Sequence, residues 1–106
     1  MLTIDLTGIN GSEKNIADII REHDSDISRE IILSICDAID TGAPRVIAIQ
    51  IIKDSEVIDF TITKNFYASA LEKCIPTLVI TEEYEVCAMA KKYIEIISQK
   101  YLEFSK

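Results

Sequence analysis

The sequence has no tryptophan, one histidine, three glycines and two prolines among its 106 residues. Because glycine and proline are scarce, we expect the loops to be short. No apolar run approaches the roughly 20 residues that a transmembrane helix requires. The first residues, MLTIDLTG, lack the basic start and the long apolar run of a signal peptide. We therefore expect a cytoplasmic protein that folds as a single domain over residues 1–106.

The chain is short of positive charge, with 11 basic against 18 acidic side chains, which gives a net charge of −7 and a pI of about 4.6. An acidic surface repels nucleic acid and anionic membranes, so neither is expected as a direct partner. The same charge suits a basic partner protein. Hydrophobic residues make up 48% of the chain, which is normal for a soluble globular domain.

The cysteines are odd in number and far apart, and each lies in an apolar segment of helical pattern: Cys36, Cys74 and Cys87. Such spacing does not indicate a disulfide framework. We expect buried free thiols in a reducing compartment.

The central stretch, residues 45–63, is predicted to form a β-hairpin around the polar tip 53–56. A symmetric turn sets three pairs of apolar residues opposite each other: Ile51 and Ile58, Ile49 and Phe60, Ile47 and Ile62. Since strand side chains alternate, all six would share one face, which only the flanking helices could cover. A strand over residues 2–6 is expected to join the hairpin.

Three short segments resemble reactive sites only in part. Residues 7–12 lie between a strand and a helix, as in a phosphate-binding turn, but Glu13 breaks the Walker pattern, so we interpret Ser12 as an N-cap. Residues 24–28 begin like a calcium loop but lack its glycine and its final glutamate. His23 has no nucleophile or carboxylate at a catalytic spacing. The sequence therefore predicts no metal, no cofactor and no enzymatic activity.

Two helices are predicted before the hairpin. The first covers residues 12–23 and has a narrow apolar stripe. The second covers residues 27–40, where isoleucines recur every four positions. Gly42 then suits a left-handed C-cap, and Pro44 stops the helix.

Residues 64–80 allow two interpretations. Apolar residues recur at helical spacing over four turns, but Pro76 lies inside the segment and cannot donate a hydrogen bond to the Glu72 carbonyl. Either the helix is kinked at Pro76, or it ends near Cys74 and residues 77–81 form a buried strand. The unbroken periodicity favours the kinked helix.

The last helix is predicted to start with Thr81 as its N-cap, followed by Glu82, Glu83 and Glu85 at the positive end of the helix dipole. An apolar stripe continues toward the end of the chain. Together with the preceding helix, the last helix should form an antiparallel helical hairpin that packs on the sheet. The predicted fold class is α+β: a three-stranded, mainly antiparallel sheet, packed with two N-terminal helices and a C-terminal helical hairpin.

The start of this last helix carries two resemblances. Residues 82–94, EEYEVCAMAKKYI, resemble a Glu-Tyr-Glu-x-Cys-Ala-x-x-Lys pattern of small bacterial toxin-immunity proteins. The same residues resemble the UvrB/UvrC-type helical hairpin, with Cys87-Ala88 in place of Ala-Ala and Lys91-Lys92 in place of Arg-Asp. The first resemblance implies an immunity protein that binds and blocks a basic toxin domain, for example a nuclease. The second implies an adaptor that contacts another protein through its helical hairpin.

Acidic residues are the candidate contacts for such a partner. They concentrate on the two N-terminal helices and on the hairpin: Asp18, Glu22, Asp24, Asp26, Asp37, Asp40, Asp54, Glu56 and Asp59. Two interpretations remain open, a solvated face and a docking surface for a basic protein.

Overall fold

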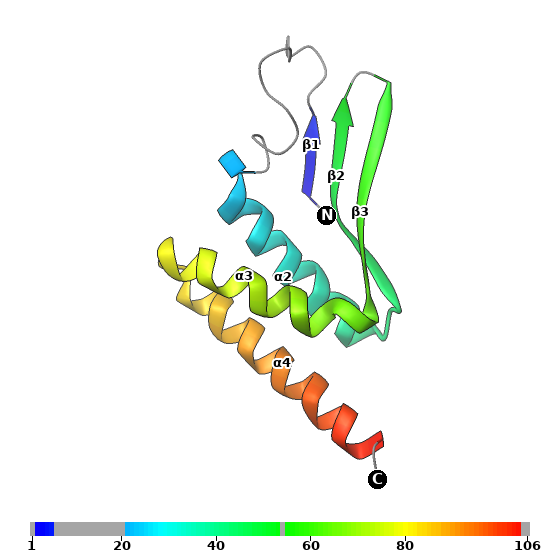
Figure 1. The fold of residues 1–106 in the computed structure, drawn as a ribbon, viewed down its shortest axis with the longest axis vertical. Coiled ribbons are helices and arrows are strands. Elements are labelled where there is room, and N and C mark those ends of the chain that lie inside the picture. The colour runs from blue at the N-terminus through cyan, green and yellow to red at the C-terminus, as the bar shows by residue number, and fades with distance from the viewer. Residues whose placement is uncertain (1, 6–20, 54, 105–106) are drawn as a thin grey trace.

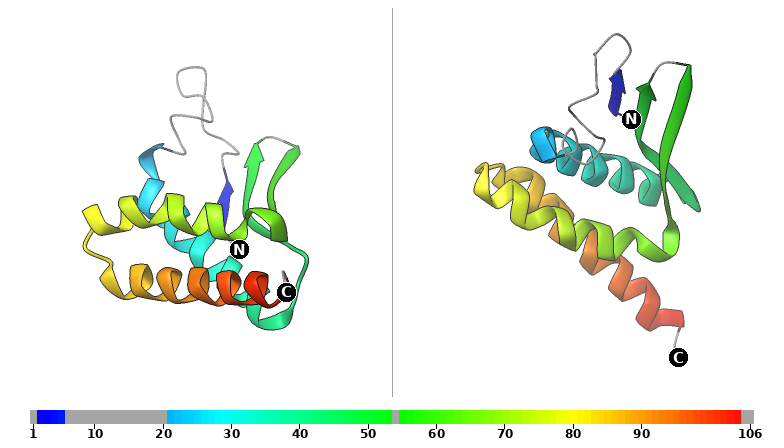
Figure 2. Two further views of the ribbon diagram at one scale, coloured as in Figure 1. Left: turned by 60° about the horizontal axis from the view of Figure 1, so that its bottom comes forward. Right: turned by 45° about the horizontal axis from the view of Figure 1, so that its top comes forward.

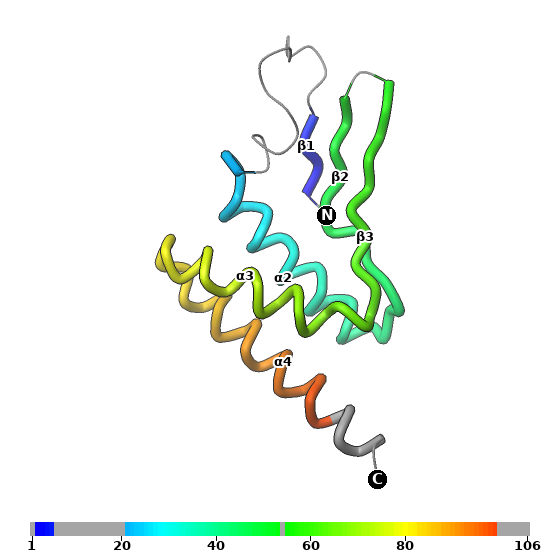
Figure 3. The backbone as a smooth tube through the Cα atoms, viewed as in Figure 1, coloured from blue at the N-terminus to red at the C-terminus, as the bar shows by residue number. Residues whose placement is uncertain are grey.

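The computed structural model describes residues 2–5, 21–53 and 55–104. Most of the predicted first helix, the predicted turn at residues 7–12, and the candidate residues Asp18 and Asp54 lie outside the described residues. The path of the chain can be followed in Figure 3. Within the described residues, no helix is both long enough and apolar enough to cross a membrane.

The sheet has three strands in the order β1-β2-β3, which confirms the predicted α+β fold (Figure 1). The strands are β1 (Leu2–Asp5), β2 (Arg45–Lys53) and β3 (Glu56–Thr63). β2 and β3 form the predicted antiparallel hairpin. β1 runs parallel to β2, so the sheet is mixed.

The register of the hairpin follows the prediction near the turn and departs from it further away. Ile51 lies opposite Ile58, and Ile49 lies opposite Phe60, as expected. A shift between Ile47 and Ile49 then places Ile47 opposite Thr61, so the predicted pairing of Ile47 with Ile62 is wrong. The cause is a bulge, in which one extra residue interrupts the alternation of a strand. As a result Ile47 is 39% exposed rather than part of the core.

Helix α2 (Asp24–Thr41) starts three residues before the predicted helix and ends almost where predicted. Gly42 has a φ of 72°, which confirms the expected left-handed C-cap. The N–H of Ala43 donates to the carbonyl of Ala38 at 2.8 Å and satisfies one of the last helical carbonyls.

The segment after the hairpin is helical. A short 3-10 turn, η1 (Lys64–Phe66), leads into helix α3 (Tyr67–Ile80), which contains Pro76. The alternative strand at residues 77–81 is therefore wrong. Apolar periodicity over four turns outweighs the single hydrogen bond that proline removes.

Helix α4 (Tyr84–Phe104) follows after a tight turn. Thr81 caps the C-terminus of α3 and is not the predicted N-cap of α4. Glu82 takes a positive φ of 61°, and the Cys87 N–H donates to the Glu83 carbonyl at 3.2 Å. The helix therefore begins at Tyr84, because the chain needs residues 81–83 to reverse direction.

Helix α2 lies between the sheet and the helical hairpin formed by α3 and α4 (Figures 1 and 2). On one side Ile27 packs with Ala48, Ile49 and Ile51 of β2. On the other side the larger core joins α2 to α3 and α4 and contains Ile32, Ile35, Cys36, Ala38, Tyr67, Leu71, Cys74, Leu78, Cys87 and Ala90. The helical hairpin thus packs mainly on α2, and only residues at the base of the sheet border its core.

Tyr67 connects the start of α3 to the loop that follows α2 through a hydrogen bond. Its side chain is almost fully buried, and its hydroxyl donates to the carbonyl of Ala43 at 3.0 Å. Burial raises the pKa of this hydroxyl. A buried tyrosine is stable here because its one polar group is satisfied.

The molecule is elongated, with extents of 55 × 29 × 17 Å and a radius of gyration of 15.4 Å. A compact domain of this length would have a radius of gyration of about 13 Å. Among the described residues, no strand lies beside the outer edge of β3 (Figure 1).

Candidate functional site

The structure does not gather the predicted acidic residues into one surface. Asp24 and Asp26 lie in the first turn of α2, whereas Asp37 and Asp40 lie near its other end. The rise of an α-helix separates Asp24 from Asp37 by about 20 Å. The described candidates form three acidic groups. Glu22, Asp24 and Asp26 lie at the start of α2, Asp37 and Asp40 lie near its end, and Glu56 and Asp59 lie on the hairpin.

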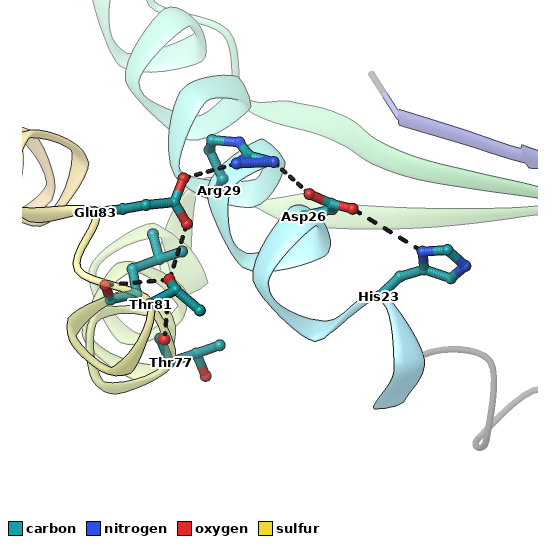
Figure 4. A network of polar contacts seen from close by, with 7 residues as sticks. His23, Asp26, Arg29, Thr77, Thr81 and Glu83 are labelled. Carbon is teal, nitrogen blue, oxygen red and sulfur yellow. Dashed lines mark hydrogen bonds and ion pairs between the residues drawn. The ribbon is translucent and has the colours of Figure 1, made fainter.

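The first acidic group, at the start of α2, is partly neutralised (Figure 4). Arg29 Nη1 lies 2.7 Å from Glu83 Oε1, and Arg29 Nη2 contacts the carboxylate of Asp26. The hydrogen bond to Glu83 is the main reason that the pKa of Arg29 is raised. Thr81 Oγ1 lies 3.0 Å from the other Glu83 oxygen. This group is therefore a tertiary contact between α2 and the α3–α4 turn as much as a surface for a partner.

His23 belongs to the same network but only at its margin. Its Nδ1 lies 4.0 Å from Asp26 Oδ2, and its side chain is exposed (Figure 4). Asp24 accepts a long hydrogen bond of 3.4 Å from Thr77. Because Asp24 and Asp26 belong to a regular helical turn, they do not form a loop that could wrap a calcium ion. No cluster of three metal-binding side chains occurs among the residues that the structure describes.

The second acidic group, at the end of α2, has no basic side chain in the last helical turn. Asp37 is exposed. The hydroxyl of Tyr93 lies 2.9 and 2.8 Å from the two oxygens of Asp40, which connects α4 to α2. This contact raises the pKa of Tyr93. The negative end of the helix dipole adds partial negative charge beside the carboxylates of Asp37 and Asp40. This end of α2, the acidic corner, therefore carries concentrated negative charge.

The third acidic group lies on the hairpin. Gln50 Nε2 donates to Asp59 Oδ1 at 2.9 Å across the two strands. A neutral amide holds this carboxylate in place without compensating its charge. Glu56 lies opposite Lys53 beside the turn and is exposed.

Most of the candidate carboxylates keep their charge uncompensated. In residues 2–5, 21–53 and 55–104, the ion pairs involve Asp26 and Glu83, and none involves Asp24, Asp37, Asp40, Glu56 or Asp59. Sequence reasoning found all five as acidic surface residues. It missed Glu83 as a structural partner, because contact between residues 54 positions apart has no local signal.

An apolar groove lies between α2 and the inner face of the hairpin. It encloses about 490 Å³ and is lined mainly by Ile27, Ile31, Ile49, Ile51, Phe60 and Ile62. Phe60 was expected in the core because it faces Ile49, but the residue is 40% exposed. Ile27 and Ile31 on the N-terminal half of α2 form one wall of the groove, and residues of the hairpin form the other.

A second apolar surface lies at the tip of the helical hairpin, where α3 turns into α4. Ile80 is 82% exposed, and Val79 and Tyr84 beside it are also exposed. Val79 belongs to the apolar residues that recur at helical spacing in residues 64–80. In the last turn of α3 only Leu78 is buried, so Val79 and Ile80 lie at the surface.

The three cysteines are free and buried, as predicted. Burial is the main cause that raises the pKa of Cys36 to about 11, and the nearby carboxylate of Asp40 adds to it. Burial also raises the pKa of Cys74, against a hydrogen bond with Ser28 that lowers it. Protonated thiols are poor nucleophiles, so these two are core residues rather than reactive groups.

Comparison of the chain with protein-family models, with curated proteins and with solved structures finds no match. The candidate sites therefore rest on the geometry and charge of the described residues.

Proposed function

We propose that this protein binds a basic partner protein through its uncompensated carboxylates, and that the partner is a toxin domain whose active site it blocks. The observation that carries the proposal is the acidic corner at the end of α2. Asp37 and Asp40 lie at the negative end of a helix dipole, without a basic residue in the last turn. Carboxylates in this position destabilise a helix, so a role in binding would account for their presence.

The geometry of Asp40 supports this role. Its carboxylate is already fixed by Tyr93, so a partner lysine or arginine would meet an ordered acceptor and the loss of side-chain entropy would be small. The net charge of −7 would attract a basic domain from a distance and accelerate association. A toxin nuclease fits this chemistry because its active site must attract phosphates. The resemblance of residues 82–94 to immunity proteins supports the same conclusion.

The test uses two double variants with equal net charge. Asp37→Lys with Asp40→Lys reverses the corner, and Glu72→Lys with Glu95→Lys reverses two exposed carboxylates on α3 and α4. We expect the first variant to weaken binding of the partner toxin domain at least tenfold beyond the second, with slower association at low salt. The partner is the product of the neighbouring reading frame or the protein recovered from the native host. Equal loss in both variants, or association rates indifferent to salt, would contradict the proposal.

A second candidate function is an adaptor, and the exposed tip of the helical hairpin favours it. Val79, Ile80 and Tyr84 form an apolar surface of the kind that occurs at protein contacts. Under this alternative, Ile80→Asp would abolish partner binding, whereas reversal of Asp37 and Asp40 would leave it intact. The two functions therefore predict opposite results for the same pair of variants.

A further inference from the structure

The outer edge of β3 has no strand beside it in the part of the chain that the structure describes. β3 is eight residues long, whereas the opposite edge strand, β1, has four. An edge strand of this length presents a row of backbone N–H and C=O groups that can pair with another strand. Natural proteins usually protect such edges with proline, with charged side chains, above all lysine, or with a bulge. β3 contains no proline or lysine, its charged residues are Glu56 and Asp59, and the hairpin's bulge lies in β2.

Side chains along β3 differ between the two faces of the sheet. Ile58, Phe60 and Ile62 face Ile51, Ile49 and Val46 of β2 and belong to the side that α2 covers. The residues between them lie on the other side and are exposed: Val57, Asp59, Thr61 and Thr63. A strand that extends the sheet must present apolar side chains to the first face and tolerate a carboxylate on the second.

We propose that the strand which pairs with β3 is β3 of a second copy of this chain, antiparallel and centred on Phe60. A two-fold axis perpendicular to the sheet keeps like faces together, so the two sheets continue into one of six strands. In this register Phe60 lies opposite Phe60 of the other copy, and Ile58 lies opposite Ile62. Asp59 lies opposite Thr61, and Glu56 lies opposite Lys64, the first residue after β3.

The charges select this register over its neighbours. If the second copy is shifted along β3 while the apolar face stays continuous, the residue opposite a given position changes by two at a time. A shift that centres the pair on Asp59 sets Asp59 opposite Asp59, which is repulsive. A shift that centres the pair on Thr61 sets Lys64 opposite Ile58. Only the register centred on Phe60 pairs Glu56 with Lys64, and symmetry makes this pair twice.

The exposure of Phe60 also favours a second copy as the partner of β3. Phe60 is 40% exposed beside the apolar groove. In the symmetric pair each ring meets its counterpart on the face that α2 covers, so the exposed ring surface of both copies is removed from water. This pairing does not use Asp37 or Asp40, and it is independent of the proposed toxin partner.

The first test is disulfide trapping. Phe60→Cys places two thiols directly opposite each other across the axis, at a separation suited to a disulfide. Val57→Cys is the matched control, because Val57 is at least as exposed, at 56%, yet would lie about 20 Å from its own counterpart. Under mild oxidation we expect a covalent dimer of the Phe60 variant and little of the Val57 variant, measured by intact mass and non-reducing gel. Equal trapping of both variants, or none of either, would overturn the proposal.

The second test keeps Phe60 and changes only the charged pair at the ends of β3. Glu56→Lys and Lys64→Glu each create two like-charge contacts, and the double variant restores both pairs in reverse. By sedimentation equilibrium we expect each single variant to weaken dimerisation about tenfold and the double variant to recover it, because each pair occurs twice. A wild-type protein that stays monomeric at about 1 mM, or a double variant weaker than both single variants, would overturn the proposal.

Discussion

Arg29 Nη1 on α2 lies 2.7 Å from Glu83 Oε1 in the turn between α3 and α4. The two side chains are only partly exposed, and Glu83 also meets the hydroxyl of Thr81. This ion pair holds the tip of the helical hairpin against the first turns of α2. Because solvent reaches it, its contribution to stability should be modest.

A double-mutant cycle on Arg29 and Glu83 measures this contribution. We expect Arg29→Met and Glu83→Gln each to lower the free energy of unfolding by about 1 kcal/mol, with a coupling energy of about 0.5–1 kcal/mol. Asp26→Asn is the control, since Asp26 meets the same guanidinium but lies within α2 and joins no second element. Denaturant unfolding gives all the values. A coupling energy of zero would show that the pair does not stabilise the fold.

The bulge in β2 makes two neighbouring isoleucines respond differently to the same change. Ile49 is buried against Ile27, so Ile49→Asp would bury an unpaired charge and should cost more than about 3 kcal/mol or prevent folding. Ile47 is part of the exposed surface, so Ile47→Asp should cost less than about 1 kcal/mol. Thermal melting of both variants checks the register. Similar melting temperatures would show that both residues share one face and that the bulge is absent.

Pro76 removes one hydrogen bond from α3, since its nitrogen cannot donate to the Glu72 carbonyl. Pro76→Ala should restore this bond and raise the free energy of unfolding by about 1–3 kcal/mol, less the entropy that alanine adds to the unfolded chain. Chemical denaturation of the variant gives the result. A loss of stability would show instead that the core between α2 and α3 requires the helix shape that proline imposes.

The thiol of Cys36 should make stability fall at alkaline pH. Its pKa is raised to about 11 in the folded protein from an ordinary value of 9.0. Between these values the unfolded chain has lost a proton that the folded protein keeps, so stability that is complete below pH 9 is lost as the pH rises toward 11. One such group contributes at most about 1.4 kcal/mol per pH unit.

Cys36→Ala isolates this contribution. The variant loses packing at every pH, so its stability deficit relative to wild type at pH 7 measures packing alone. At pH 10 the deficit should be smaller, because only the wild type has lost the thiol contribution. Urea unfolding at both pH values gives the two deficits. An unchanged deficit would show that burial does not hold the proton on Cys36.

Local chemistry predicted the three strands and the helices α2, α3 and α4, and tertiary contacts decided the details of their pairing. Gly42 and the isoleucine spacing before it define the end of α2 without further information. The pairing of Ile49 with Phe60 follows from turn symmetry, but the bulge near Ile47 does not, because nothing in an alternating apolar run marks where an extra residue enters. The parallel direction of β1 could not be predicted either, since the alternation of apolar residues in a four-residue strand is the same in both directions.

The candidate site was less predictable than the fold. The acidic candidates among the described residues are exposed, as expected. However, the length of α2 separates Asp24 from Asp37, and this divides the set into separate groups. Arg29 neutralises part of one group through Glu83, far away in the chain. The distribution of charge over the surface therefore depends on the fold, whereas the composition gives only the net charge.

The central position of α2 has a consequence for cooperativity. The sheet and the helical hairpin each bury their apolar side mainly against this one helix, on opposite sides. Within the described chain neither has another helix that could replace it, so loss of α2 would expose both cores together. The two layers should therefore not melt as separate units, and a single all-or-none transition is expected even though the molecule contains two clusters of buried residues.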